Sequence, residues 1–259
     1  MCHSMHYIIL VTVCALLAGC RPSAQYPTEL LLADSLTQCD ADSAIRLLQD
    51  LAPIMSQAKE PVRRYHQLLT IKAQDKAFIT HTSDSLMLDV LRYYQEEGDP
   101  CLLPEAYYYA GRVTRDLGDA PQALDYFHHA LDAMQTSDYQ SRMQGQEKRT
   151  LNLQGKIHAQ MGYLFRRQHL YDEAIKAFEQ AYRVDSLNRN TTGMVLSLCC
   201  VGDTYRHIKE FQKSLINYHN AEILALTTND SVRNVDICYQ IAIQTHLHSF
   251  CIDLFSPFP

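Results

Sequence analysis

The side chains best suited to bind a metal ion lie near the end of the chain, where Cys238, His246, His248 and Cys251 occur close together. Two cysteines with two histidines are a common ligand set for zinc. On a helix, however, side chains two positions apart point about 200° apart, so His246 and His248 could not hold one ion. The sequence also lacks a Gly-rich phosphate loop, a nucleophile elbow and a His-Glu-x-x-His motif. We therefore predict no catalytic residues, no metal and no cofactor, and a protein that is not an enzyme.

Cys20 is the residue with the most specific predicted chemistry. Residues 7–18 form an apolar run of 12 residues, which is shorter than the about 20 residues of a membrane-spanning helix but typical of a signal-peptide core. The run ends in Leu17-Ala18-Gly19-Cys20, which resembles the lipobox of bacterial lipoproteins. The resemblance implies a lipoprotein signal peptide over 1–19 and a lipid-modified Cys20, followed by a Pro-containing tether over 20–27. The alternative is an ordinary apolar segment with a chance cysteine.

The composition excludes several classes of protein. Gly and Pro number 9 each in 259 residues, about half their usual share, which argues against a turn-rich β-barrel and a disordered chain. The 23 Lys and Arg against 29 Asp and Glu give a net charge of −6 and form no basic block, so we expect no nucleic-acid partner. The six cysteines after Cys20 are irregularly spaced, and we expect most of them to be small buried residues, not disulfides.

A three-fold repeat organises the middle of the chain. Gly111, Gly162 and Gly202 are each followed after 12 residues by a small residue, after 16 by an aromatic residue and after 19 by alanine. These residues are Ala123, Ala174 and Ser214, then Phe127, Phe178 and Tyr218, and finally Ala130, Ala181 and Ala221. Apolar residues around them recur at spacings of three and four, as on one face of a helix. The pattern predicts amphipathic helices that are stable only when packed together.

The repeat resembles the tetratricopeptide repeat (TPR), in which two antiparallel helices approach through small residues and an aromatic side chain fills the gap to the next pair. The resemblance implies an all-α fold, a right-handed superhelical solenoid of helix pairs. We expect about five hairpins and a final unpaired helix. Divergent hairpins would occupy 28–100, the regular array 101–230, and the terminal helix and tail 231–259. This last segment would be either the natural end of the array or the end of a shortened one. Because the units are 40 to 51 residues long, against the usual 34, longer helices are expected.

The resemblance also implies which side chains line a concave groove. In TPR proteins the first helix of each pair lines this groove, through positions three before and one, four and five after the glycine. The candidate partner-binding residues carried over in this way are Tyr108, Arg112, Arg115, Tyr163, Arg166, Arg167, Arg206 and His207. Arginine suits the carboxylates of an extended peptide or an acidic glycan. Alternatively, each arginine is solvated or paired with a neighbour such as Asp116, Asp203 or Glu173. Replacing Arg166 and Arg167 together is expected to change stability little.

These observations predict a lipid-anchored, extracytoplasmic TPR scaffold that binds a protein or peptide partner in its groove. The membrane would be contacted only through the lipid, in the cell envelope, on the periplasmic face of the outer membrane rather than the cell surface. Two alternatives are the sensor part of a longer TPR-containing signalling regulator and a glycan-capture lipoprotein. The apolar terminal helix further predicts self-association, because its exposed face would be sticky.

Overall fold

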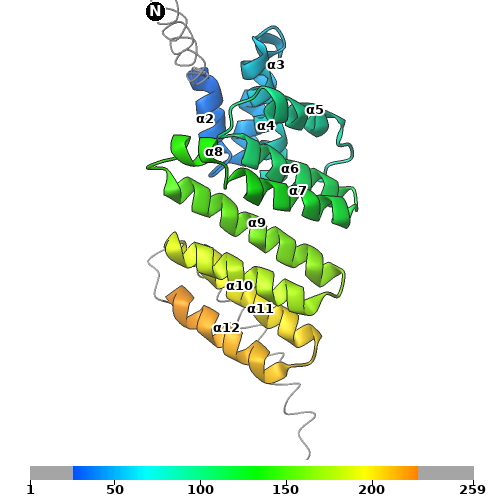
Figure 1. The fold of residues 1–259 in the computed structure, drawn as a ribbon, viewed down its shortest axis with the longest axis vertical. Helices are drawn as coiled ribbons and strands as arrows, with labels where there is room; N and C mark the ends of the chain where they lie inside the picture. Colours follow the sequence, from blue (N-terminus) through cyan, green and yellow to red (C-terminus); the bar gives the residue numbers. More distant parts are fainter. Residues whose placement is uncertain (1–25, 227–259) are drawn as a thin grey trace, which may run out of the picture. The chain divides into compact units, whose positions relative to one another are not determined.

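The computed structural model describes residues 26–226 of the 259-residue chain. Within this range every regular element is an α-helix, which confirms the all-α prediction (Figure 1). The helices belong to two compact units that divide after Phe78. None of the helices between residues 26 and 226 is long and apolar enough to cross a membrane. The signal peptide, Cys20 and the terminal helix expected from residue 231 lie outside the described residues.

The first unit contains three described helices, α2 (Thr28–Leu36), α3 (Ala41–Met55) and α4 (Glu60–Lys76). The Asp40 carboxylate caps α3 by accepting a hydrogen bond from the backbone N–H of Ser43 at 3.0 Å. Lys72 on α4 is buried, and its Nζ donates to the Asp34 carboxylate on α2 at 2.6 Å. A largely buried ion pair therefore joins the first described helix of this unit, α2, to α4.

The second unit carries the regular repeats. Its described helices are α5 (Ser85–Glu96), α6 (Leu103–Asp116), α7 (Ala120–Ala133), α8 (Ser137–Arg142), α9 (Glu147–Arg167), α10 (Tyr171–Leu187), α11 (Thr191–His207) and α12 (Phe211–Leu226). Three pairs of neighbouring helices pack most closely, α6 with α7, α9 with α10 and α11 with α12. Figure 1 shows α9 to α12 in succession along this unit. These three pairs are the hairpins predicted from the glycine repeat.

The length of each repeat has two different structural causes. The expected longer helices are present in α9, α10 and α11, which have 21, 17 and 17 residues. They are absent from α6 and α7, which have 14 residues each. The 51 residues from Gly111 to Gly162 are instead accommodated partly by the short helix α8, which the sequence analysis did not anticipate. Within the range 28–100, where divergent hairpins were expected, the consecutive helices α4 and α5 belong to different units.

The repeat glycines let the two helices of each pair approach closely. A Cβ added at Gly111 would lie 2.5 Å from a ring carbon of Phe127, and one at Gly162 would lie 2.6 Å from a ring carbon of Phe178. Phe127, Phe178 and the corresponding Tyr218 are all at most 1% exposed. The glycine and the aromatic residue 16 positions later are therefore one packing unit within a helix pair, a contact that the sequence analysis did not specify.

Candidate functional site

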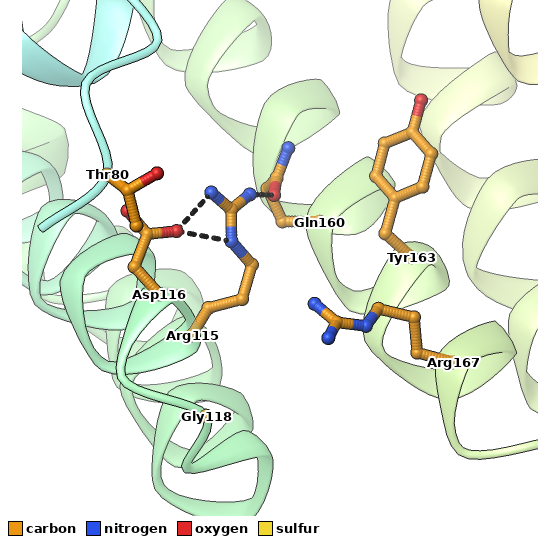
Figure 2. Close-up of a pocket in the computed structure, with 7 residues that line it drawn as sticks. All are labelled: Thr80, Arg115, Asp116, Gly118, Gln160, Tyr163 and Arg167. Atoms are coloured by element: carbon orange, nitrogen blue, oxygen red, sulfur yellow. Dashed lines mark hydrogen bonds and ion pairs between the residues drawn. The ribbon is translucent and has the colours of Figure 1, made fainter.

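An open pocket of about 500 Å³ lies between the first helices of two successive hairpins, α6 and α9. Its lining includes Arg115, Asp116 and the turn glycine Gly118 from the first hairpin, Gln160, Tyr163 and Arg167 from α9, and Thr80. Figure 2 shows these side chains around one space. Three of the predicted groove residues, Arg115, Tyr163 and Arg167, are therefore brought together by the fold.

Arg115 forms a fixed polar network on one wall of this pocket. Its Nη2 and Nε donate to one oxygen of Asp116 at 2.7 and 3.2 Å, and its Nη1 donates to Gln160 Oε1 at 2.6 Å. The other oxygen of Asp116 accepts from the backbone N–H of His81 at 3.2 Å. Burial alone would raise the pKa of Asp116, but these hydrogen bonds and the Arg115 charge outweigh it and hold the pKa below its usual value. Asp116 is therefore ionised and neutralises Arg115.

Arg167 behaves differently from Arg115 at the same pocket. It is exposed, and within the described part of the chain no hydrogen bond or ion pair holds its guanidinium. In Figure 2 this guanidinium points across the pocket towards Arg115, and no contact joins it to the other residues drawn. Arg167 is therefore the pocket arginine whose charge is available to a ligand.

Arg166 lies beside Arg167 in sequence but belongs to the packing between repeats. Its guanidinium lies 5.4 Å from the ring centroid of Tyr163 and 5.7 Å from that of Phe178. Its Nη1 also lies 3.5 Å from a carboxylate oxygen of Asp203 on α11, and its side chain is only 22% exposed. These contacts give Arg166 a structural role, so we now expect replacement of Arg166, unlike that of Arg167, to lower stability.

Asp203 is the acceptor around which the α11 groove positions are arranged. It accepts a hydrogen bond from the Tyr218 hydroxyl at 2.6 Å, and Arg206 Nη2 lies 3.5 Å away. His207 is exposed and stacks on Tyr171 with 6.2 Å between ring centroids. Arg206 and His207 thus lie at the surface, but neither lines the pocket of Arg115 and Arg167.

Tyr108 and Arg112 form a further pair on α6. Tyr108 is 3% exposed and packs edge to face on Tyr109, so the prediction that its ring faces a partner is wrong. Its hydroxyl accepts from Arg112 Nη1 at 3.1 Å. Tyr108 is therefore buried in the core, and its hydroxyl helps to hold Arg112.

Tyr163 joins the pocket to the core. Its ring packs edge to face on Phe178, and its hydroxyl accepts from the Sγ of buried Cys200 at 3.2 Å. Burial, and then the neighbouring Cys200, raise the pKa of the Tyr163 hydroxyl, so it is neutral. Cys199 is partly exposed, Cys200 is buried, and both are free thiols. Of the four described cysteines only Cys200 is buried, whereas most were expected to be.

Three pocket residues were not anticipated. Gln160 lies two positions before Gly162 and Gly118 seven positions after Gly111, both outside the groove offsets used above, and Thr80 lies outside the repeats. Among residues 26–226 no group of three or more His, Cys, Asp or Glu side chains could hold a metal ion. The Cys238, His246, His248 and Cys251 cluster lies outside that range.

Comparison with known proteins identifies the fold. No family model and no curated protein matches the sequence. Among solved structures, the apo form of RapI matches with a TM-score of 0.61 and 12% identity, over 81% of this chain and 73% of that one. A putative kinesin light chain from Podosopora anserina with nearly identical TPR-like repeats matches with a TM-score of 0.53 and 13% identity, over 79% and 96%.

The chain has a TPR-like fold. A third similar structure is BtubC (BKLC) from P. vanneervenii, with a TM-score of 0.52 and 11% identity over 88% of this chain and 94% of that one. At such identities the likeness concerns the TPR-like fold, whose first helices here are α6, α9 and α11.

Proposed function

We propose that this TPR-like protein is a scaffold that holds an acidic segment of a protein partner at the pocket between α6 and α9. The observation that carries the proposal is the contrast between the two pocket arginines. Asp116 already neutralises Arg115 at 2.7 Å, whereas Arg167 is exposed and keeps its charge for a ligand. A planar guanidinium binds a carboxylate through two parallel hydrogen bonds, which favours an Asp, Glu or C-terminal carboxylate as the ligand group.

The rest of the pocket favours an extended peptide over a small anion. The space is open, about 500 Å³, and is lined by the Tyr163 ring and the uncharged Gln160 and Thr80 as well as by charge. Such a surface can hydrogen-bond a peptide backbone and contact an apolar side chain beside the carboxylate. Apart from Thr80, the lining belongs to two packed hairpins, so little ordering is needed when a partner binds.

Anchoring through a lipid on Cys20 is the second part of the proposal. The apolar run over 7–18 followed by Leu17-Ala18-Gly19-Cys20 supports it. A diacylated cysteine supplies two chains, as stable attachment requires. The tether would leave the pocket free to bind a partner in the cell envelope. The protein is proposed to act without catalysis.

Binding of labelled peptides tests the recognition step. A fluorescent 12-residue peptide of alternating Glu and Ala should bind, and its affinity should fall as salt is raised. Arg167→Ala should weaken binding by about 1.5–3 kcal/mol, the range for hydrogen bonds to charged groups, with an unchanged melting temperature. Arg183→Ala, at an exposed arginine of α10 outside the pocket, is the matched control. Equal affinity of Arg167→Ala and wild type, or equal binding of a Lys and Ala peptide, would reject the site.

A further inference from the structure

Three side chains of the pocket lie on one stripe of α9. Gln160, Tyr163 and Arg167 all line the pocket, and they are spaced three and four residues apart, as neighbours on one helix face are. Because an α-helix rises about 1.5 Å per residue, Gln160 and Arg167 start about 10 Å apart along its axis. The pocket therefore has a second polar group, Gln160, that is well separated from the charge of Arg167.

The chemistry of Arg115 fixes which way the amide of Gln160 faces. A guanidinium offers only N–H donors, so the group that meets Arg115 Nη1 at 2.6 Å must be the carbonyl oxygen of Gln160. Figure 2 shows the amide nitrogen of Gln160 on the side away from Arg115. Among residues 26–226 no group accepts a hydrogen bond from this nitrogen. Its two N–H groups are therefore left for a ligand.

The acceptors on this wall of the pocket are already engaged. Both oxygens of Asp116 accept hydrogen bonds, one from Arg115 and the other from the backbone N–H of His81, and the side chain is only 12% exposed. The oxygen of Gln160 is held by Arg115. Gln160 and Arg167 therefore present only N–H donors, and such a surface favours a ligand with two acceptors over an amine.

We propose that Gln160 is a specificity-determining residue of this pocket, which donates from Nε2 to a backbone carbonyl of the acidic segment while Arg167 holds the carboxylate. Arg115 is the positioning residue that keeps the Gln160 amide in this orientation. Since about 10 Å is the length of about three residues of an extended peptide, the carbonyl belongs to a residue within about three of the acidic one. The inference rests on the proposed function, and it names the second group that the partner must offer.

Single-atom changes in a peptide test the proposal on the full chain. The probe is a seven-residue peptide of Ala and Ser with one central Glu. In a matched series, sulfur, a weaker acceptor than oxygen, replaces one backbone carbonyl oxygen at a time. In the wild-type protein at least one replacement should weaken binding about 2- to 10-fold, as for the loss of one hydrogen bond. Gln160→Met should weaken binding of the all-oxygen peptide similarly, and its affinity should no longer respond to that replacement.

Two further variants separate recognition from a purely structural role. Gln180→Met makes the same change at an exposed residue of α10 outside the pocket, and it should keep both the affinity and the sulfur effect. Arg115→Met leaves Gln160 in place but releases its amide, so it should reduce the sulfur effect. A merely structural Arg115 could change the affinity for every peptide but would leave the ratio between oxygen and sulfur peptides unchanged.

The outcomes distinguish this proposal from the proposed function. An equal sulfur effect in Gln160→Met and wild type, or no sulfur effect at any carbonyl in wild type, would overturn the role of Gln160. If Arg167→Ala still weakens binding in that case, the proposed function stands without it. Binding that does not change in Arg167→Ala, or no binding of the peptide to wild type, would reject both.

Discussion

Neighbouring carboxylates hold three of the groove arginines. Asp116 fixes Arg115, and Asp203 lies beside both Arg166 and Arg206. All of these arginines occupy predicted groove positions. In the structure Arg115, Arg166 and Arg206 lie beside carboxylates, whereas among the described residues Arg167 has no such partner. Binding specificity at the pocket therefore depends on which arginines are not already paired with an Asp side chain of the protein.

The contact of a repeat glycine with its aromatic partner gives a prediction about stability. Gly162→Ala would place a Cβ 2.6 Å from the Phe178 ring, and overpacking of this kind costs about 1–3 kcal/mol. Unfolding in urea should show this loss. Gly202→Ala, with a closest ring contact of 2.9 Å, should lose less. Because Phe178→Leu removes the ring, Gly162→Ala should cost little in that background; an equal cost in both backgrounds would contradict the packing argument.

The turns that join the two helices of each pair contain a residue in the same left-handed backbone conformation. Gly118, His169 and Lys209 all follow the repeat glycine by seven residues and have positive φ angles of 90°, 62° and 63°. Each lies just beyond the end of a first helix, where a left-handed residue closes the helix and glycine is favoured. Only the first repeat has glycine there, so the other two turns carry backbone strain.

Lys209→Gly should therefore stabilise the protein. Relief of the left-handed strain, reduced by the larger entropy of glycine in the unfolded chain, leaves a gain of about 0.5–1 kcal/mol. Gly118→Ala is the opposite change at the equivalent position, where no neighbouring atom lies within 4 Å of the added Cβ. It should destabilise through backbone strain alone. Thermal unfolding compares the two, and shifts of the same sign would refute the common turn.

The second helical pair also contains a histidine that should make stability depend on pH. Burial, and then the charge of His128, lower the pKa of His158 below 6.5. The folded state therefore disfavours the protonated ring. The stability of the fold with neutral His158 is fully present above pH 6.5, and it is lost as the pH falls through the lowered pKa of the folded state. His158→Gln should reduce the loss of stability between pH 7.5 and 5.5, measured by urea unfolding. An unchanged loss of stability in His158→Gln would contradict this prediction.

Much of the fold follows from the sequence, whereas the site does so only in part. The glycine, alanine and aromatic offsets locate α6, α7, α9, α10, α11 and α12 because tight helix packing restricts residue type. Helix packing does not restrict where charged surface side chains occur or which partners they bind. The pairing of Arg115 with Gln160 depends on the distance between two hairpins, and the burial of Tyr108 depends on its rotamer. Neither can be read from spacing.

In the proposed function the whole protein combines a peptide-binding pocket with a lipid anchor at Cys20. Cys20→Ser should prevent incorporation of labelled palmitate and leave the protein unprocessed or in the soluble fraction, because the acylated thiol is missing. Cys39→Ser, at an exposed cysteine, should remain labelled and membrane-bound. Palmitate still entering the Cys20→Ser protein would show that the anchor lies elsewhere.

Site-specific photocrosslinking in the producing cells tests directly whether an acidic protein segment binds in the pocket. A photoreactive amino acid at Gln160, inside the pocket, is compared with one at Lys176, on the exposed outer face of α10. We expect a protein adduct from position 160 that maps to an acidic segment of the partner and disappears with Arg167→Glu. We expect no such adduct from position 176. An adduct from position 160 that persists with Arg167→Glu, or one formed only from position 176, would contradict it.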